Sequence, residues 1–428
     1  KPVVLIVLDG WGIGRGSKGN AIAKAKLPTI EKLNMYYPHT ALQASGISVG
    51  LPWEEAGNSE VGHITLGAGK VIYQSLPRIT MDIQSGNFFK QRVFIEAVEN
   101  TKKNNSALHL MGLIGKGGVH SQVEHLYALL ELARDQKVEK LFIHAFTDGR
   151  DSAPNSGADS LKELQQKMAS YGVGKIATVS GRYFAMDRNN NWDRVEKTYK
   201  AIVRGDGNQI ADAVQYLRDS YSKRIYDEFI EPAVIVNAEG PIGPIKENDS
   251  VIFFNFREDR ARQMTRAFVL PDFSDFKRDL LKNVYFVTMI QYEEGLPVHV
   301  AFQPMSVRSP LGKILSENNM TQLRISETEK FAHVTYFFNG GSEMAYPGED
   351  RTIIPSLTID SFADAPEMSS REITEKVITA IKENKYNFVL LNFANADIVG
   401  HTGQEAATIK AVEIIDSCLA RLIPVVLM

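Results

Sequence analysis

Two short motifs bring together residue types that can act as nucleophiles or metal ligands. In the segment G-N-S-E-V-G-H at residues 57–63, glycines flank Ser59 just before a stretch that could begin a helix. Glycine lets the backbone approach a ligand closely and a helix amino end favours phosphate, so Ser59 is a candidate nucleophile. Taken alone, an ordinary serine N-cap explains this residue better. Because the sequence has no G-x-S-x-G motif, we expect activation by a metal rather than by a serine triad.

The second motif is Asp397 with His401, directly after an apolar run at 388–393. On a helix this spacing puts both side chains on one face. Oxygen and nitrogen ligands without thiolate suit manganese, zinc or iron, so we favour metal binding. Asp9 ends another apolar run, and for this residue a turn-capping role is an equally good explanation.

A set of arginines follows apolar runs within one region of the chain: Arg150, Arg182, Arg188, Arg257 and Arg260. Guanidinium groups bind phosphate and carboxylate in a bidentate manner, so their convergence would suit a small substrate with two anionic groups. The alternative is that each pairs with a nearby carboxylate such as Asp151, Asp187 or Asp259. Five arginines in such positions favour a substrate site.

The remaining basic candidates differ in their surroundings. His120 lies in the flexible turn K-G-G-V-H-S at 116–121, which favours a functional role. His109, His144 and His333 lie in strand-like runs, so we expect these three in the core or in a sheet, and we expect His125 on a helix. Lys330 precedes the strand-like run 331–338, and an isolated lysine is usually solvated.

The elements that must position these residues form a regular pattern. Six apolar runs end in polar clusters, and we predict them as strands: 3–8, 107–114, 141–146, 175–180, 251–256 and 388–393. Helical stretches lie between them, among them 122–135, 160–170, 192–204 and 371–384. Apolar runs alternating with helices are typical of parallel strands buried on both faces. The sequence therefore predicts an α/β fold with its ligand crevice at the carboxyl ends of the strands.

Composition excludes several classes of protein. The 428 residues predict two or three domains, and the balance of 48 Lys plus Arg against 51 Asp plus Glu disfavours a general nucleic-acid binder. No apolar run approaches the roughly 20 residues of a membrane span, so we expect a cytoplasmic protein without a membrane partner. The single cysteine, Cys418, excludes an internal disulfide and leaves oxygen and imidazole as metal ligands.

Taken together, the motifs resemble those of the cofactor-independent phosphoglycerate mutases. The matching segments run in the family's order along nearly the whole chain: V-L-D-G-W-G at 7–12, G-N-S-E-V-G-H at 57–63, G-G-V-H-S at 117–121, D-G-R-D at 148–151, G-R-Y-F-A-M-D-R at 181–188, N-F-R-E-D-R at 255–260, E-K-F-A-H-V-T-Y-F-F-N-G-G at 329–341 and N-F-A-N-A-D-I-V-G-H-T-G at 392–403. As a set they are highly specific, although D-G-W-G alone would be weak.

The resemblance implies an alkaline-phosphatase-like, metal-binding domain made of residues 1–73 and 305–428. A substrate-binding α/β phosphotransferase domain, residues 77–301, would be inserted into it. The implied reaction is interconversion of 3-phosphoglycerate and 2-phosphoglycerate in glycolysis and gluconeogenesis, without bisphosphoglycerate. We expect a monomer whose only partner is this small molecule.

The resemblance also implies roles for individual residues. Ser59 would accept the phosphoryl group and, with Asp9, ligate one of two Mn²⁺ ions, while Asp397 and His401 would ligate the other. Asp151 would move the proton of the glycerate hydroxyl. Phosphate and carboxylate would be bound by His120, Arg150, Arg182, Arg188, Arg257, Arg260 and Lys330.

One departure affects the expected activity. The family's remaining metal ligands come from an Asp-His pair in a motif of the A-D-H-G-N type and from a later histidine, and this sequence contains neither motif. We therefore expect a carboxy-terminally truncated member with little or no mutase activity, even with excess Mn²⁺. The alternatives are another metal-dependent phosphatase or phosphomutase of the same superfamily, or an inactive phosphoglycerate-binding remnant.

Overall fold

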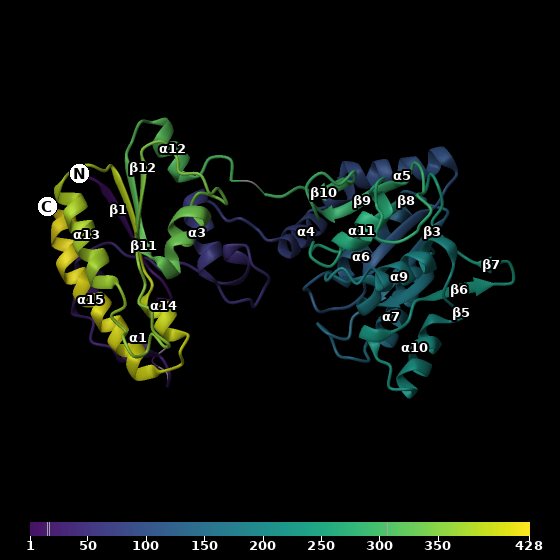
Figure 1. The fold of residues 1–428 in the computed structure, drawn as a ribbon, viewed down its shortest axis with the longest axis horizontal. Helices are drawn as coiled ribbons and strands as arrows, with labels where there is room; N and C mark the ends of the chain where they lie inside the picture. The colour runs from purple at the N-terminus through teal and green to yellow at the C-terminus, as the bar shows by residue number, and fades with distance from the viewer. Residues whose placement is uncertain (15, 17, 306) are drawn as a thin grey trace. The chain divides into compact units, whose positions relative to one another are not determined.

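The computed structural model describes residues 1–14, 16, 18–305 and 307–428. The chain forms two compact units (Figure 1). Unit 1 consists of Lys1–Tyr73 together with Met305–Met428, and unit 2 consists of Gln74–Pro304. Unit 2 thus lies between the two segments of unit 1 in the sequence, and both chain ends belong to unit 1.

Unit 1 is built on a four-stranded parallel sheet with the order β1-β13-β11-β12. Its strands are β1 (Val3–Leu8), β11 (Gln322–Glu327), β12 (Glu349–Ile354) and β13 (Phe388–Phe393). Its helices are α1 (Ala21–Lys24), α2 (Pro28–Tyr36), α3 (Ser59–Ala68), α12 (Leu311–Glu317), α13 (Ser370–Lys382), α14 (Asn395–Gly400) and α15 (Glu405–Leu427), with the short turns η1 (Gly46–Val49), η4 (Thr328–Lys330) and η5 (His333–Phe337).

Helices cover both faces of this sheet (Figure 1). Along β13, Val389 and Leu391 pack in one cluster with residues of α13 and α15. The alternating residues Phe388 and Leu390 pack on the other face, against η5 and α12. Burial on both faces explains why β13 is an uninterrupted apolar run up to its polar end.

Unit 2 contains a nine-stranded sheet with the order β10-β9-β8-β2-β3-β4-β6-β5, and β7 pairs with β6. Its strands are β2 (Leu108–Leu113), β3 (Leu141–Thr147), β4 (Lys175–Gly181), β5 (Asn208–Ile210), β6 (Ala233–Asn237), β7 (Gly240–Pro241), β8 (Ser250–Phe253), β9 (Tyr285–Ile290) and β10 (His299–Phe302). Its helices are α4 (Ser75–Gln84), α5 (Arg92–Asn104), α6 (Val123–Asp135), α7 (Gly157–Tyr171), α8 (Arg182–Ala185), α9 (Trp192–Arg204), α10 (Ala213–Ser222) and α11 (Arg262–Val269), with the turns η2 (Phe88–Lys90) and η3 (Asp227–Phe229).

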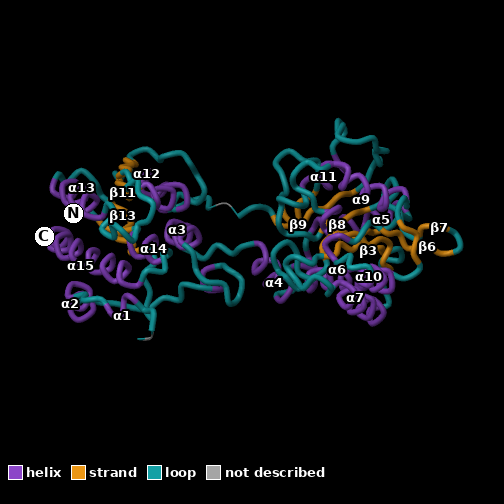
Figure 2. The backbone as a smooth tube through the Cα atoms, turned by 60° about the horizontal axis from the view of Figure 1, so that its bottom comes forward, coloured by secondary structure: helices purple, strands orange, loops and turns teal. Residues whose placement is uncertain are grey.

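Two hydrophobic cores hold unit 2 together, one on each face of its sheet. The larger cluster joins strand residues such as Leu110 and Ile143 to helices α5, α6, α7 and α10. The second joins Met111 and Phe253 to helices α9 and α11. The tube in Figure 2 shows the strands of this unit with helices around them.

The α/β class predicted from the sequence is confirmed, and all six predicted strands are present within a few residues of their expected bounds. Strands β4 and β6 pair in the antiparallel direction, as do β6 and β7, so the second sheet is mixed rather than wholly parallel. The prediction of a strand over 331–338 is wrong. That run contains the π-helix η5 (His333–Phe337), and Val334 within it and Phe338 directly after it, four residues apart, both enter the core.

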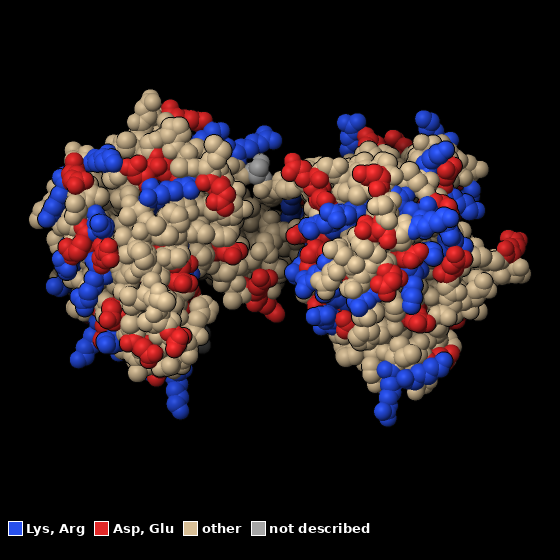
Figure 3. Space-filling view, in the orientation of Figure 1, with Lys and Arg blue, Asp and Glu red and all other residues tan. Residues whose placement is uncertain are grey.

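The expected core positions of the histidines are also borne out in part. His109 and His144 are fully buried on neighbouring strands, and His125 is buried on α6. His333 lies on η5 rather than on a strand. Among the described residues, no helix is both long and apolar enough to cross a membrane. On the face shown in Figure 3, Lys and Arg are interspersed with Asp and Glu over both units.

Candidate active site

Ser59 is the first residue of α3, and its hydroxyl is held between two charged groups. The N-cap of this helix is Asn58, whose side chain accepts a hydrogen bond from the amide of Val61, so the N-cap explanation for Ser59 is wrong. Ser59 Oγ donates to Asp9 Oδ1 at 2.6 Å and accepts from Lys330 Nζ at 2.8 Å. A hydroxyl with a carboxylate and an ammonium on either side is an arrangement that can activate a nucleophile.

Asp9 follows β1 directly and does not serve as a simple turn cap. Besides the Ser59 hydroxyl, its Oδ2 accepts a hydrogen bond from Asn392 Nδ2 at 2.8 Å. Burial would raise the pKa of Asp9, but the hydrogen bonds from Ser59 and Asn392 and the charge of Lys330 outweigh burial and lower it. Asp9 is therefore ionised at neutral pH although its side chain is buried.

Lys330 lies where the two candidate metal-binding carboxylates meet. Its Nζ donates to Asp397 Oδ2 at 2.6 Å and lies 3.3 Å from Asp9 Oδ1. The side chain is only 5% exposed, so the expectation of a solvated lysine is wrong. Lys330 ends η4 immediately after β11, and Asp9 and Asp397 follow the adjacent strands β1 and β13. The three groups thus meet at the carboxyl edge of one parallel sheet. The strand pattern predicts this position for Asp9 and Asp397, whereas β11, the strand before Lys330, was not predicted.

The backbone holds these strand ends close together. Gly10 has a φ of +73°, and a Cβ at this position would lie 2.5 Å from the Cα of Asp397. Only glycine fits such an approach. Asp397 lies on α14, and its Oδ1 is 3.5 Å from Nε2 of His401, which follows the helix on the same face.

The donors present fit part of a site for a hard divalent cation. Oxygens of Asp9, Ser59 and Asp397 all surround one positive charge, the Lys330 ammonium, and His401 adds an imidazole next to Asp397. Oxygen with imidazole is a ligand set that Mn²⁺ accepts. In the part of the chain that the structure describes, no group of three or more His, Cys, Asp or Glu side chains could enclose a metal. These residues therefore supply ligands without forming a complete cage.

The other candidate residues gather in unit 2, after β2, β3, β4 and β8, which are neighbours in the sheet. Arg182 is the most buried of them, and its Nη1 donates to both Asp148 Oδ1 and Asp151 Oδ2 at 2.6 Å. Asp148 also accepts from the amide of Asp151 at 3.1 Å and from Ser152 Oγ at 2.7 Å. Asp148 and Arg182 together fix the loop that carries Asp151.

His120 is buried beside two carboxylates in the same group. Its Nε2 lies 3.9 Å from Asp151 Oδ2, and its Nδ1 lies 3.7 Å from Asp259 Oδ1. Burial and then the charge of Arg182 lower the pKa of His120 to about 4, so the ring is neutral at pH 7. A Cβ on Gly117 would lie 2.7 Å from the carbonyl oxygen of Asp151, and this close approach brings the His120 turn against the Asp151 loop.

The remaining arginines have unequal partners. Asp259 pairs with both Arg188 and Arg257, and Arg150 lies 3.4 Å from Glu228. Arg260 donates to the carbonyl oxygen of Met186 at 3.0 Å and forms no ion pair with any described residue. Burial and then repulsion from Arg182, Arg188 and Arg150 lower the pKa of Arg260, as expected where cations gather. The arginines therefore converge, and most of them also pair with carboxylates.

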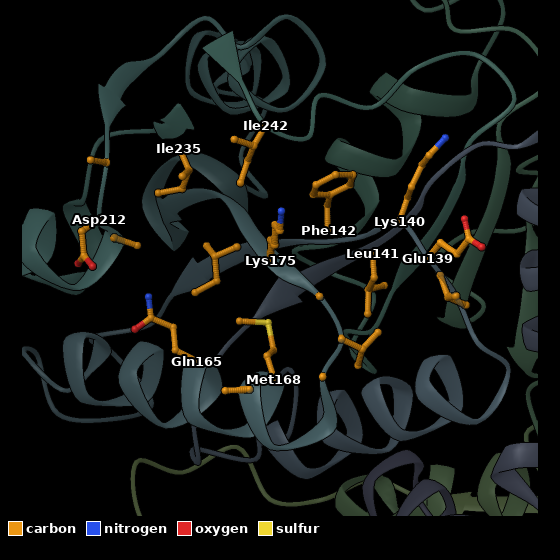
Figure 4. A pocket seen from close by; sticks show the side chains of 18 residues that line it. Glu139, Lys140, Leu141, Phe142, Gln165, Met168, Lys175, Asp212, Ile235 and Ile242 are labelled. Carbon is orange, nitrogen blue, oxygen red and sulfur yellow. The ribbon is translucent and has the colours of Figure 1, made fainter. Parts of the chain in front are cut away.

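A further pocket in unit 2, of about 650 Å³, contains none of these candidates (Figure 4). It is lined by Leu141 and Lys175 at the amino ends of β3 and β4, and by Met168 of α7. These are the ends opposite to those that carry Asp148 and Arg182. The chemistry of unit 2 lies at the carboxyl edge of its sheet.

Sequence reasoning missed three residues that position the candidates. Asp148 could have been found because it ends β3 within the D-G-R-D segment. His63 donates from Nδ1 to the carbonyl oxygen of Ser59 at 2.7 Å, as its spacing of one helical turn allows. Asn392 contacts Asp9 and, at 3.1 Å, His63 Nε2, and the signal was a buried amide in an otherwise apolar strand.

Comparison with known proteins assigns the chain to a family. The family model described as BPG-independent PGAM N-terminus (iPGM_N) matches residues 79–294. The 2,3-bisphosphoglycerate-independent phosphoglycerate mutase of Clostridioides difficile (strain 630) is 50% identical over 424 residues, which cover 99% of this chain and 82% of that protein. The enzyme of the same name from Methanococcoides burtonii is 50% identical over 425 residues, with the same coverage of 99% and 82%. The chain belongs to the 2,3-bisphosphoglycerate-independent phosphoglycerate mutase family.

A solved structure of this mutase family supports the fold. Leishmania mexicana phosphoglycerate mutase, crystallised at low cobalt concentration, is 34% identical with a TM-score of 0.57, covering 99% of this chain and 80% of that one. The predicted family and the α/β, alkaline-phosphatase-like fold class are thereby confirmed. The roles of individual residues stay predictions.

Proposed function

We propose that the reaction of this chain is the interconversion of 3-phosphoglycerate and 2-phosphoglycerate, the isomerase step of glycolysis and gluconeogenesis, through a phosphoserine at Ser59, with slow turnover because the described residues supply only part of a metal site. Membership of the mutase family supports the reaction and its independence from bisphosphoglycerate. The assignment of Ser59 rests on two hydrogen bonds of its hydroxyl, which donates to Asp9 at 2.6 Å and accepts from Lys330 at 2.8 Å.

The chain's own groups suit the attack of Ser59 on a phosphoryl group. The hydroxyl proton already points to Asp9 Oδ1, so Asp9 can accept it as the Oγ–phosphorus bond forms and the phosphorus–oxygen bond to the glycerate breaks, with Asp151 moving a proton onto the glycerate oxygen that leaves. The Lys330 ammonium, held by Asp397, stabilises negative charge on Oγ. The amino end of α3 favours the phosphate that Ser59 would then carry.

Two Mn²⁺ ions complete this proposal. Asp9 and Ser59 would hold one ion, and Asp397 and His401 the other. When bound, such ions supply Lewis-acid charge that stabilises both the attacking and the leaving oxygen. Because Lys330 now pairs with both carboxylates, metal binding would compete with these ion pairs.

In unit 2 the substrate would be bound by its two anionic groups. The groups proposed to bind phosphate and carboxylate, together with Lys330 of unit 1, are His120, Arg150, Arg182, Arg188, Arg257 and Arg260. Asp151 would take the proton of the glycerate hydroxyl that attacks the phosphoserine, and Arg182 keeps Asp151 oriented at 2.6 Å. Reorientation of the glycerate between two transfers would give the isomer. We also propose a cytoplasmic monomer that binds neither nucleic acid nor membrane.

The test is chemical trapping of the intermediate. The chain is incubated with Mn²⁺ and 3-phosphoglycerate labelled in its phosphate, quenched in acid and digested, and the labelled peptide is identified. Because the described residues offer few metal ligands, we follow labelling in a single turnover rather than the isomerisation rate. We expect label on Ser59, none in Ser59→Ala, and unchanged labelling in Ser361→Ala, a loop serine of the same unit. Label on another residue would overturn the assignment.

A further inference from the structure

Asp259 is a carboxylate inside the proposed substrate site to which no role has been given. Its Oδ2 accepts a hydrogen bond from Arg188 Nη1 at 2.8 Å, and its Oδ1 lies 3.1 Å from Arg257 Nε. His120 Nδ1 lies 3.7 Å from the same Oδ1. Three groups proposed to bind the substrate's anions thus surround one carboxylate of the protein.

This carboxylate carries a full negative charge at neutral pH. Burial would raise the pKa of Asp259, but the hydrogen bond from Arg188 and the charges of Arg257 and His120 outweigh burial and lower it. Because His120 is neutral at pH 7, the charge of Asp259 is balanced by the two guanidinium groups.

The pairing can be exchanged for a ligand, unlike that of Arg182. The side chains of Arg188 and Arg257 are 45% and 47% exposed, whereas that of Arg182 is 2% exposed between two carboxylates. Asp259 Oδ1 is buried yet accepts no hydrogen bond of good geometry from any described residue. The contacts of Asp259 are therefore incomplete, and a bidentate anion would satisfy the arginines better.

We propose that Asp259 is a positioning residue that holds Arg188 and Arg257 together in place of an anionic group of the substrate. In the free protein it prevents the two like-charged guanidinium groups from separating. On binding, the substrate's carboxylate or phosphate takes over these contacts, so Asp259 weakens the affinity for substrate and favours its release. This inference rests on the proposed function, because it takes phosphoglycerate as the ligand.

The experiment measures the dissociation constant of 3-phosphoglycerate by calorimetry for the whole chain and its variants. We expect Asp259→Asn, which keeps the shape and removes the charge, to bind roughly three- to ten-fold more tightly, the range expected for two partly exposed ion pairs. Asp259→Ser removes the charge with a smaller side chain and should act in the same direction, so one folded variant suffices.

A carboxylate elsewhere in unit 2 provides the matched control. Glu293 also contacts two arginines, Arg266 at 2.6 Å and Arg262 at 3.8 Å, and neither belongs to the proposed site. Glu293→Gln removes the same charge and should leave the dissociation constant unchanged. A structural role for Asp259 would weaken binding, so unchanged or weaker binding in Asp259→Asn overturns the inference. If the wild type itself does not bind 3-phosphoglycerate, the proposed function fails instead.

Discussion

At the scale of single residues, Lys330 has the most demanding position in unit 1. Its ammonium lies among Asp9, Asp397 and Ser59 with almost no exposure to solvent. Without it, two carboxylates would face each other in a buried place. A lysine here therefore stabilises the metal-free protein and also provides the charge that the Ser59 chemistry needs.

We predict that Lys330→Met destabilises unit 1 by about 3 kcal/mol at pH 7 without metal, the cost of breaking a buried ion pair. The pKa of Asp9 is lowered in the folded wild type, so its contribution to stability is present above its ordinary value of 3.8 and is lost as the pH falls further. The difference between variant and wild type should therefore shrink at acidic pH. The measurement is hydrogen exchange of the β1 and β13 amides at several pH values.

Lys313→Met is the matched control for this prediction. Lys313 lies 3.7 Å from Glu317 on the exposed face of α12, in the same unit. Exposed pairs of this kind contribute about 0.2–1 kcal/mol. If both variants lost the same amount of unfolding free energy, burial would not make the ion pairs of Lys330 more stabilising than an exposed pair.

At the scale of elements, strand ends were predictable and the segments between them were less so. Strands such as β13 can be predicted from an uninterrupted apolar run, because both faces of a buried parallel strand are covered. The run 331–338 is also largely apolar but contains the π-helix η5. Short apolar runs cannot be assigned by periodicity alone, and here the contacts of Val334 and Phe338 with β13 decide the conformation.

The site shows the same division. Asp9 and Asp397 could be placed near one another because parallel strands end at one edge of a sheet, whereas Lys330 could not, because the strand before it, β11, was not among the predicted strands. The contacts that Asn392 makes with Asp9 and His63 depend on which face of β13 packs against α3. Only the tertiary structure determines that face. Similarly, the sequence offers several acids near the arginines, and folding selects Asp148 and Asp259 while Asp187 pairs with Arg194.

Helix α6 carries a buried histidine that makes unit 2 sensitive to acid. His125 contacts Thr80 Oγ1 at 3.0 Å, and burial lowers its pKa to about 3 from an ordinary value of 6.5. Since the unfolded chain binds this proton more readily, the stability that neutral His125 provides is present above pH 6.5 and is lost as the pH falls toward 3. The loss amounts to about 1.4 kcal/mol per pH unit.

We predict that His125→Leu reverses its effect with pH. At pH 7 the variant should be less stable than the wild type by about 1 kcal/mol, because the hydrogen bond to Thr80 is lost. At pH 5 it should be the more stable of the two, since it no longer has to keep a histidine neutral. Hydrogen exchange of the β2 and β3 amides gives both values. His39→Gln, at an exposed histidine, should leave the profile unchanged, and parallel curves for His125→Leu and wild type would contradict the prediction.

At the scale of the whole molecule, the two kinds of chemistry belong to different compact units. Asp9, Ser59, Lys330 and Asp397 are all in unit 1, and the arginines proposed to bind substrate are all in unit 2. Each group is held by contacts within its own unit, such as Gly10 against Asp397 and Arg182 against Asp148. Binding of metal and binding of substrate anions should therefore be separable properties of this one chain.

We predict that variants in the two units have independent effects on binding. Arg260→Ala should weaken 3-phosphoglycerate binding about ten- to a hundred-fold, the loss of a charge-assisted hydrogen bond, and leave Mn²⁺ binding unchanged. Asp397→Asn should weaken Mn²⁺ binding and leave the 3-phosphoglycerate affinity within about two-fold. The double variant should show the sum of the two effects, because the altered residues share no partner.

Both affinities can be measured by calorimetry on the intact chain, with Arg204→Ala as a control because Arg204 pairs with the exposed Asp279 away from the proposed site. We expect the wild type to bind Mn²⁺ weakly, since four donors shared between two ions leave each with fewer than the usual three protein ligands. Tight binding of two Mn²⁺ ions that survives Asp397→Asn would mean that other residues hold the metal. Loss of substrate affinity in Asp397→Asn as large as that in Arg260→Ala would show that the two sites act as one, since the metal-binding carboxylate would then contribute directly to holding the substrate.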